Sequence, residues 1–167
     1  MTVAANVEHG GTSRGLVPGR PTGPLMIFVG LASAVFTVGT ALHAFVIVTP
    51  ETLERMMVLA GADPGGVDGF LSIFRAVGVA YIIGNAVGVW ALRRRPSMWL
   101  FWVVIGVNAT QAAGLLMVPP EMFTAARERF GSVGVLPSLV TDGGAAVVVI
   151  VLLGSLAATR TVWGRVR

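Results

Sequence analysis

Long apolar segments alternate with short polar ones along this chain of 167 residues. Four of the apolar segments are long enough to cross about 30 Å of hydrocarbon, which takes roughly 20 residues of helix. Prolines lie at or near the segment boundaries, where a helix tolerates them. The pattern therefore predicts four transmembrane helices, at residues 25–48, 70–92, 98–118 and 136–158.

The connections between these segments indicate how the helices are arranged. Residues 93–97, RRRPS, form so short a turn that the second and third helices must be antiparallel neighbours. The two longer connections each carry a short amphipathic pattern, and the first opens with Thr49, Pro50 and Glu51, a combination typical of a helix start. Both patterns are too short and too charged to span, so we expect these segments to lie in the membrane interface.

The distribution of arginine predicts the orientation in the membrane. Eight arginines fall on the side of the chain ends and the RRRPS turn, and three on the side of the longer connections. Because positive residues are enriched in cytoplasmic loops, we expect a multi-pass protein of the inner (plasma) membrane with both termini in the cytoplasm. We expect residues 1–24 to form a flexible cytoplasmic tail, residues 25–158 the transmembrane domain and residues 159–167 a basic cytoplasmic tail. An interfacial aromatic belt is expected near the cytoplasmic ends, at Trp90, Trp99, Trp102 and Trp163.

Composition agrees with a membrane protein. Hydrophobic residues make up 54% and charged residues 12% of the chain, whereas soluble domains carry about 25% charged residues. The net charge of +4 is explained by topology in a lipid bilayer rather than by nucleic-acid binding. The absence of cysteine excludes disulfides and thiolate metal sites. The expected fold class is all-α: an integral membrane, up-down-up-down bundle of four transmembrane helices with two short extracytoplasmic amphipathic helices.

Polar residues within the spans are the candidate functional residues, because each costs free energy to bury in hydrocarbon. His43, Arg75, Gln111 and Asp142 come from different helices, and their spacing from the helix ends places all four roughly 7–10 Å below the outer boundary. Asn108 lies three residues before Gln111 and shares its helix face. Arg75 and Asp142 have opposite charges, so we expect an ion pair with two charge-assisted hydrogen bonds. This polar layer is interpreted either as a structural clamp or as a ligand site.

Small residues predict close helix packing. Gly84 and Gly88 form a GxxxG pair in the second helix, and Gly30 belongs to a small-residue face of the first. No catalytic motif accompanies them, and one histidine with one aspartate is too small a set for a metal. We therefore assign no catalytic residue, no metal and no cofactor from motifs. An enzyme using Asp142 and His43 as acid and base ranks last.

The segment FRAVGVAYIIGNAVGVWALRRRPSMWLFWVVIGVNATQAAGLL, residues 74–116, carries a family resemblance. Its early arginine (Arg75), the glycine-spaced helix that follows and the short basic turn resemble the DoxX-like superfamily of small four-helix membrane proteins. Some members of that superfamily are membrane subunits associated with oxidoreductases that pass electrons to quinone. The resemblance implies an accessory or anchoring subunit and supplies no catalytic residue.

Three functions are compatible with these features. The first is a non-catalytic accessory or anchoring subunit of a larger membrane complex, which assembles with other membrane subunits or with itself. The second is a bundle that binds a lipid or quinone in its outer third, with Arg75 and His43 meeting the polar head. The third is a proton-coupled transporter in which Asp142 titrates.

Overall fold

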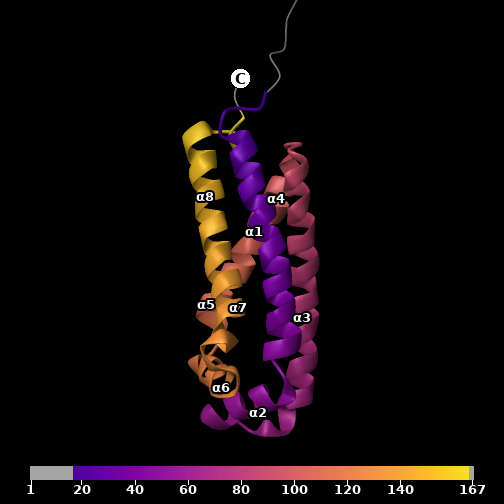
Figure 1. Ribbon diagram of the computed structural model, residues 1–167, viewed down its shortest axis with the longest axis vertical. Coiled ribbons are helices and arrows are strands. Elements are labelled where there is room, and N and C mark those ends of the chain that lie inside the picture. The colour runs from indigo at the N-terminus through magenta and orange to yellow at the C-terminus, as the bar shows by residue number, and fades with distance from the viewer. Residues whose placement is uncertain (1–16, 166–167) are drawn as a thin grey trace, which may run out of the picture.

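The computed structural model describes residues 17–165, which form an all-helical bundle without a sheet (Figure 1). Residues 1–16 and 166–167 of the predicted tails lie outside this range. The helical elements, in chain order, are α1 (Thr22–Leu42), η1 (His43–Ile47), α2 (Pro50–Leu59), η2 (Pro64–Gly66), α3 (Val67–Gly88), η3 (Val89–Arg93), α4 (Met98–Ala112), α5 (Gly114–Met117), α6 (Pro120–Phe130), η4 (Gly131–Val135), α7 (Leu136–Ser138), η5 (Leu139–Gly143), α8 (Gly144–Thr159) and η6 (Val162–Gly164).

Four continuous helical segments are long and apolar enough to cross a membrane: Thr22–Ile47, Pro64–Arg93, Met98–Met117 and Pro120–Thr159. The last segment includes the charged helix α6, so we take its spanning part to be α7, η5 and α8. The first and last residues of the four predicted helices differ by only a few positions from most of the bounds of these segments. The predicted fold class, an all-α membrane bundle of four helices, is confirmed, and the chain is a multi-pass membrane protein.

The two amphipathic helices α2 and α6 lie at one end of the bundle, called here the α2–α6 end (Figure 1). Ion pairs join them, with 2.6 Å between Arg55 Nε and Glu128 Oε2 and 3.5 Å between Arg129 Nη1 and Glu51 Oε2. Their buried faces form an apolar cluster with neighbouring segments, which includes Val48, Leu53, Met56, Met57, Leu71, Met122 and Ala125. The two helices therefore close this end of the bundle as one packed layer.

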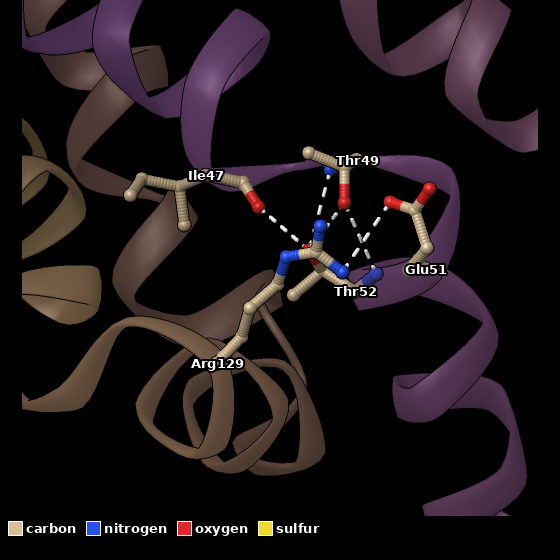
Figure 2. A network of polar contacts seen from close by, with 5 residues as sticks. All are labelled: Ile47, Thr49, Glu51, Thr52 and Arg129. Atoms are coloured by element: carbon tan, nitrogen blue, oxygen red, sulfur yellow. Dashed lines mark hydrogen bonds and ion pairs between the residues drawn. The ribbon is translucent and has the colours of Figure 1, made fainter.

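Helix α2 begins where its sequence predicted a start. Thr49 is the N-cap and accepts a hydrogen bond from the backbone N–H of Thr52 at 3.3 Å, while Pro50 occupies the first turn. Thr52 Oγ1 also donates to the carbonyl of Ile47 at 2.8 Å, which ties α2 to the end of the first spanning segment. Figure 2 shows these contacts together with the Glu51–Arg129 ion pair. These contacts therefore tie α2 to η1, and the ion pair links it to α6.

The opposite end, called here the arginine end because Arg93, Arg94, Arg95 and Arg160 lie there, differs from the prediction. Helix α8 stops at Arg160, in the left-handed region, and the chain turns back through η6 into the bundle. Trp163 is completely buried and its Nε1 donates to the Ser97 carbonyl at 2.7 Å. It therefore seals the core instead of joining the predicted aromatic belt, whereas the other three tryptophans are about half exposed.

The glycines predicted to mediate packing contact neighbouring helices of the same chain. A Cβ atom on Gly88 would lie 2.9 Å from Ser33 Cβ in α1, and one on Gly84 would lie 2.8 Å from Val107 Cγ2 in α4. A Cβ atom on Gly30 would lie 2.5 Å from Leu92 Cγ. The two glycines of the GxxxG pair therefore serve two different helix contacts within the bundle.

Candidate functional site

A cavity of ≈ 280 Å³ lies within the bundle, next to η1 and α5, the parts of the first and third spanning segments that lead into α2 and α6. It is bounded by α1, η1, α3, α4, α5 and η5, so all four spanning segments contribute to its wall. The wall is mainly apolar with a few polar groups, and its residues are Thr40, His43, Ala44, Phe74, Val77, Gly78, Tyr81, Thr110, Gln111, Gly114, Met117, Val118, Thr141 and Asp142.

Irregular backbone surrounds this cavity. His43 begins the π-helical segment η1, in which the Val48 N–H donates to the His43 carbonyl at 2.9 Å, and Asp142 lies in the second π-helical segment, η5. The third spanning segment breaks between α4 and α5, next to Gly114. Single π-helical turns are rare and are frequent at functional sites. Three of the four spanning segments therefore lose α-helical regularity where they meet the cavity.

Asp142 obtains its hydrogen bonds from its own helical segment. Ser138 Oγ donates to Oδ2 at 2.8 Å and Thr141 Oγ1 donates to Oδ1 at 3.1 Å. Gly114 lies so close that a Cβ atom there would be 3.1 Å from Oδ2. The carboxylate is thus held against the backbone of α5 at the cavity wall.

The predicted ion pair between Arg75 and Asp142 is wrong. Within residues 17–165 the ion pairs are the two that join α2 to α6, and neither includes Asp142. Helix α3 faces the cavity with Phe74, Val77, Gly78 and Tyr81, which are spaced as one helical face.

Arg75 directly follows Phe74, which belongs to the cavity face of α3. Successive residues of an α-helix are rotated by about 100°, so the Arg75 side chain points away from the cavity. Its Cζ lies 5.7 Å from the centre of the Phe45 ring, and its Nε is buried without a hydrogen-bond partner. The spacing of Arg75 from its helix end predicted its depth but not the direction of its side chain.

Gln111 is the centre of a hydrogen-bond network that connects three helices. Its Oε1 accepts from Asn85 Nδ2 at 2.9 Å, and its Nε2 donates to Thr40 Oγ1 at 3.1 Å. Asn85 is on α3 and Thr40 is on α1, so the amide of Gln111 links these helices to α4. Asn108, predicted in the same layer, is buried but does not line the cavity, and its Nδ2 donates to the Val104 carbonyl of its own helix at 2.8 Å.

His43 is partly buried at the cavity wall, beside Phe74. The ring centres of these two residues are 5.6 Å apart, and His43 Nδ1 is buried without a hydrogen-bond partner. The structure therefore brings His43, Gln111 and Asp142 to one cavity and leaves Arg75 and Asn108 off its wall.

Several residues of this site are not among the predicted site residues. Tyr81, Gly114 and Thr141 line the cavity, and Ser138 holds Asp142. The one usable signal is the spacing in SLVTD, because residues four apart on a helix are neighbours. The RRRPS turn predicts that the helices of Asn85 and Gln111 are neighbours, but nothing in the sequence shows that these two side chains meet.

The chemistry available at this site is that of hydrogen bonding and charge. No group of three His, Asp or Glu side chains within residues 17–165 is arranged to hold a metal ion. No family model, curated protein or solved structure matches the chain. The resemblance to the DoxX-like superfamily therefore remains a prediction, and function is argued from the site itself.

Proposed function

We propose that this protein binds an amphipathic small molecule of the lipid or quinone class, with the polar head in the cavity. The observation that carries the proposal is the convergence of His43, Gln111 and Asp142 on one cavity with an otherwise mainly apolar wall. Small-molecule sites are typically apolar pockets of about 300–1,000 Å³ in which a few polar groups fix the orientation of the ligand. A volume of ≈ 280 Å³ suits a head group or a single ring.

Access from the lipid phase supports this class of ligand. Three lining residues, Val77, Thr110 and Met117, are exposed on the outer surface of the bundle, between α3 and the α4–α5 region. This surface belongs to spanning segments, so it faces acyl chains rather than water. A lipophilic molecule can therefore place its head in the cavity while its apolar body stays among the lipids.

Binding is favoured over transport by the packing beyond the cavity. Towards the arginine end the bundle is filled by an apolar core that includes Phe101, Val104, Val148, Leu152 and Trp163. Each of these side chains is at most 3% exposed, and Trp163 closes the end. A proton-coupled transporter that uses Asp142 would need a second polar path through this core, so we rank that function second.

We also propose the membrane and the orientation of the protein, on the basis of its arginine distribution. With the arginine end in the cytoplasm of a plasma membrane, the cavity lies in the outer half of the bilayer. An accessory-subunit role, which the family resemblance implies, is compatible with ligand binding because neither requires a catalytic residue. Its partners would be other membrane subunits or a second copy of the chain.

The test uses a glycine substitution that fills the cavity. Gly114→Leu introduces a side chain beside Asp142, whereas Gly154→Leu adds the same volume in α8, where a Cβ atom meets nothing within 4 Å. Each variant and the wild-type chain are purified from native membranes in mild detergent, and bound small molecules are extracted and identified by mass spectrometry. We expect one amphipathic species with the wild type and Gly154→Leu and its loss from Gly114→Leu. Equal recovery from both variants, or no bound species with the wild type, would contradict the proposal.

A further inference from the structure

We infer that the head group bound in this cavity is a protonated amine and that the Asp142 carboxylate is its counter-ion. This inference rests on the proposed function and adds the chemical class of the ligand. Asp142 is the one lining residue with a formal charge when histidine is neutral. It faces His43 of η1, Tyr81 of α3 and Gln111 of α4 across the cavity, and no arginine lines the wall.

The charge of Asp142 has no compensating cation in the described part of the chain. Neither ion pair among residues 17–165 includes it, and Arg75 lies on another face of α3. An uncompensated carboxylate within a spanning segment is costly, so such residues are normally paired. A cationic ligand would supply the missing partner.

The hydrogen bonds at Asp142 leave room for such a ligand. Ser138 and Thr141 each donate one hydrogen bond to it. A carboxylate has about four lone-pair sites, so further acceptor sites remain. Both observed partners are neutral hydroxyls, which hold the carboxylate in place without neutralising its charge.

The rest of the wall can accept a hydrogen bond from an ammonium. Gln111 uses one of its two N–H groups on Thr40, and the Thr110 hydroxyl donates to backbone carbonyls of its own helix. His43 Nδ1 is buried without a partner and, when unprotonated, is an acceptor. A primary ammonium has three N–H donors and no acceptor, which suits this set.

Other head groups fit this wall less well. A phosphate or carboxylate head would be repelled by Asp142 and would find no arginine on the wall. The carbonyl oxygens of a quinone could accept hydrogen bonds from Tyr81 or Gln111, but a neutral quinone would leave the charge of Asp142 uncompensated. Phe74 and Tyr81 contribute aromatic rings to the wall, and aromatic faces attract cations rather than anions. The wall therefore selects for a positive head.

The test compares head groups on a constant eight-carbon chain. Octylammonium, octyltrimethylammonium, octanol and octanoate are titrated into the full chain in nanodiscs of a zwitterionic phospholipid, and the heat measured with protein-free nanodiscs is subtracted. We expect octylammonium to bind at least tenfold more tightly than octanol and than octyltrimethylammonium, which has no N–H donor. We expect no binding of octanoate.

Two substitutions assign the effect to the carboxylate. Asp142→Asn should weaken octylammonium binding at least tenfold and leave octanol binding unchanged, and the retained octanol binding reports an intact cavity. Asp68→Asn, which removes an exposed carboxylate at the start of α3, should leave octylammonium binding unchanged.

Failure of the inference can be told apart from failure of the proposed function. If octylammonium binds no more tightly than octanol, or if its affinity survives Asp142→Asn, the inference is overturned while the cavity remains a binding site. The inference is also overturned if a short-chain quinone binds more tightly than octylammonium and if its binding is insensitive to Asp142→Asn. If Gly114→Leu binds all probes as the wild type does, the proposed function itself fails.

Discussion

Replacement of Gly78 by alanine tests the close contact between α3 and the π-helical segment η1. A Cβ atom at position 78 would lie 2.8 Å from the Cβ of Ala44, which is closer than Cβ atoms in proteins essentially ever come to another heavy atom. The methyl group of Ala44 has no rotamer through which it can move away, so the two segments must separate. Overpacking of this kind costs about 1–3 kcal/mol. Alanine recovers about 1 kcal/mol of helix propensity relative to glycine, so the expected net loss is about 0–2 kcal/mol.

A matched variant isolates the packing cost. Gly106→Ala is also within a spanning helix, α4, but a Cβ atom at position 106 would meet nothing within 4 Å. It should gain about 1 kcal/mol from helix propensity alone. The free energy of unfolding, measured by tryptophan fluorescence during titration from a mild detergent into SDS, should therefore differ between the two variants by about 1–3 kcal/mol. Equal stability of Gly78→Ala and Gly106→Ala would refute the close contact and with it the described shape of the cavity wall.

Three further predictions concern other parts of the molecule. Trp163→Ala should lower the free energy of unfolding by about 3–5 kcal/mol in the same assay, because it removes a fully buried aromatic ring. A double-mutant cycle of Asn85→Ala and Gln111→Ala should return a coupling energy of about 0.6–1.7 kcal/mol, and additive effects would exclude their hydrogen bond. The hydroxyl of Thr49 lowers the pKa of Glu51, with a smaller contribution from Arg129, so Thr49→Ala should raise that pKa in a carboxyl NMR titration. Stability linked to Glu51 is present above its ordinary pKa and is lost as the pH falls through the lowered value, so the variant should lose it at a higher pH.

The positions of the spanning helices were predictable because they depend on short-range properties of the chain. A run of about 20 apolar residues is long enough to cross hydrocarbon, and the prolines and the arginine turn mark where such runs end. The start of α2 at Pro50 was predictable for a similar reason, since the cap, proline and acid lie within three consecutive residues. The π-helical segments at His43 and Asp142 carry no comparable local signal.

The depth of the candidate site residues in the membrane was predictable, but the direction of their side chains was not. Counting residues at about 1.5 Å each placed His43, Arg75, Gln111 and Asp142 at one level. Only three of them line the cavity, because Arg75 is one residue away from the cavity-facing side of α3. Opposite charges at equal depth suggested a pair, whereas Asp142 is held by the nearby hydroxyls of Ser138 and Thr141.

The amino-acid sequence alone predicts a bundle of four membrane-spanning helices with two short amphipathic helices, because hydrophobic length and helix-start signals depend on residues that are close along the chain. Which polar side chains meet depends instead on how the helices pack against one another. The rotation of each helix about its axis is set by close contacts, such as those of Gly78 with Ala44 and Gly88 with Ser33. These contacts join residues more than 30 positions apart, and they fix which face of α3 meets the cavity, so that Arg75 lies away from it.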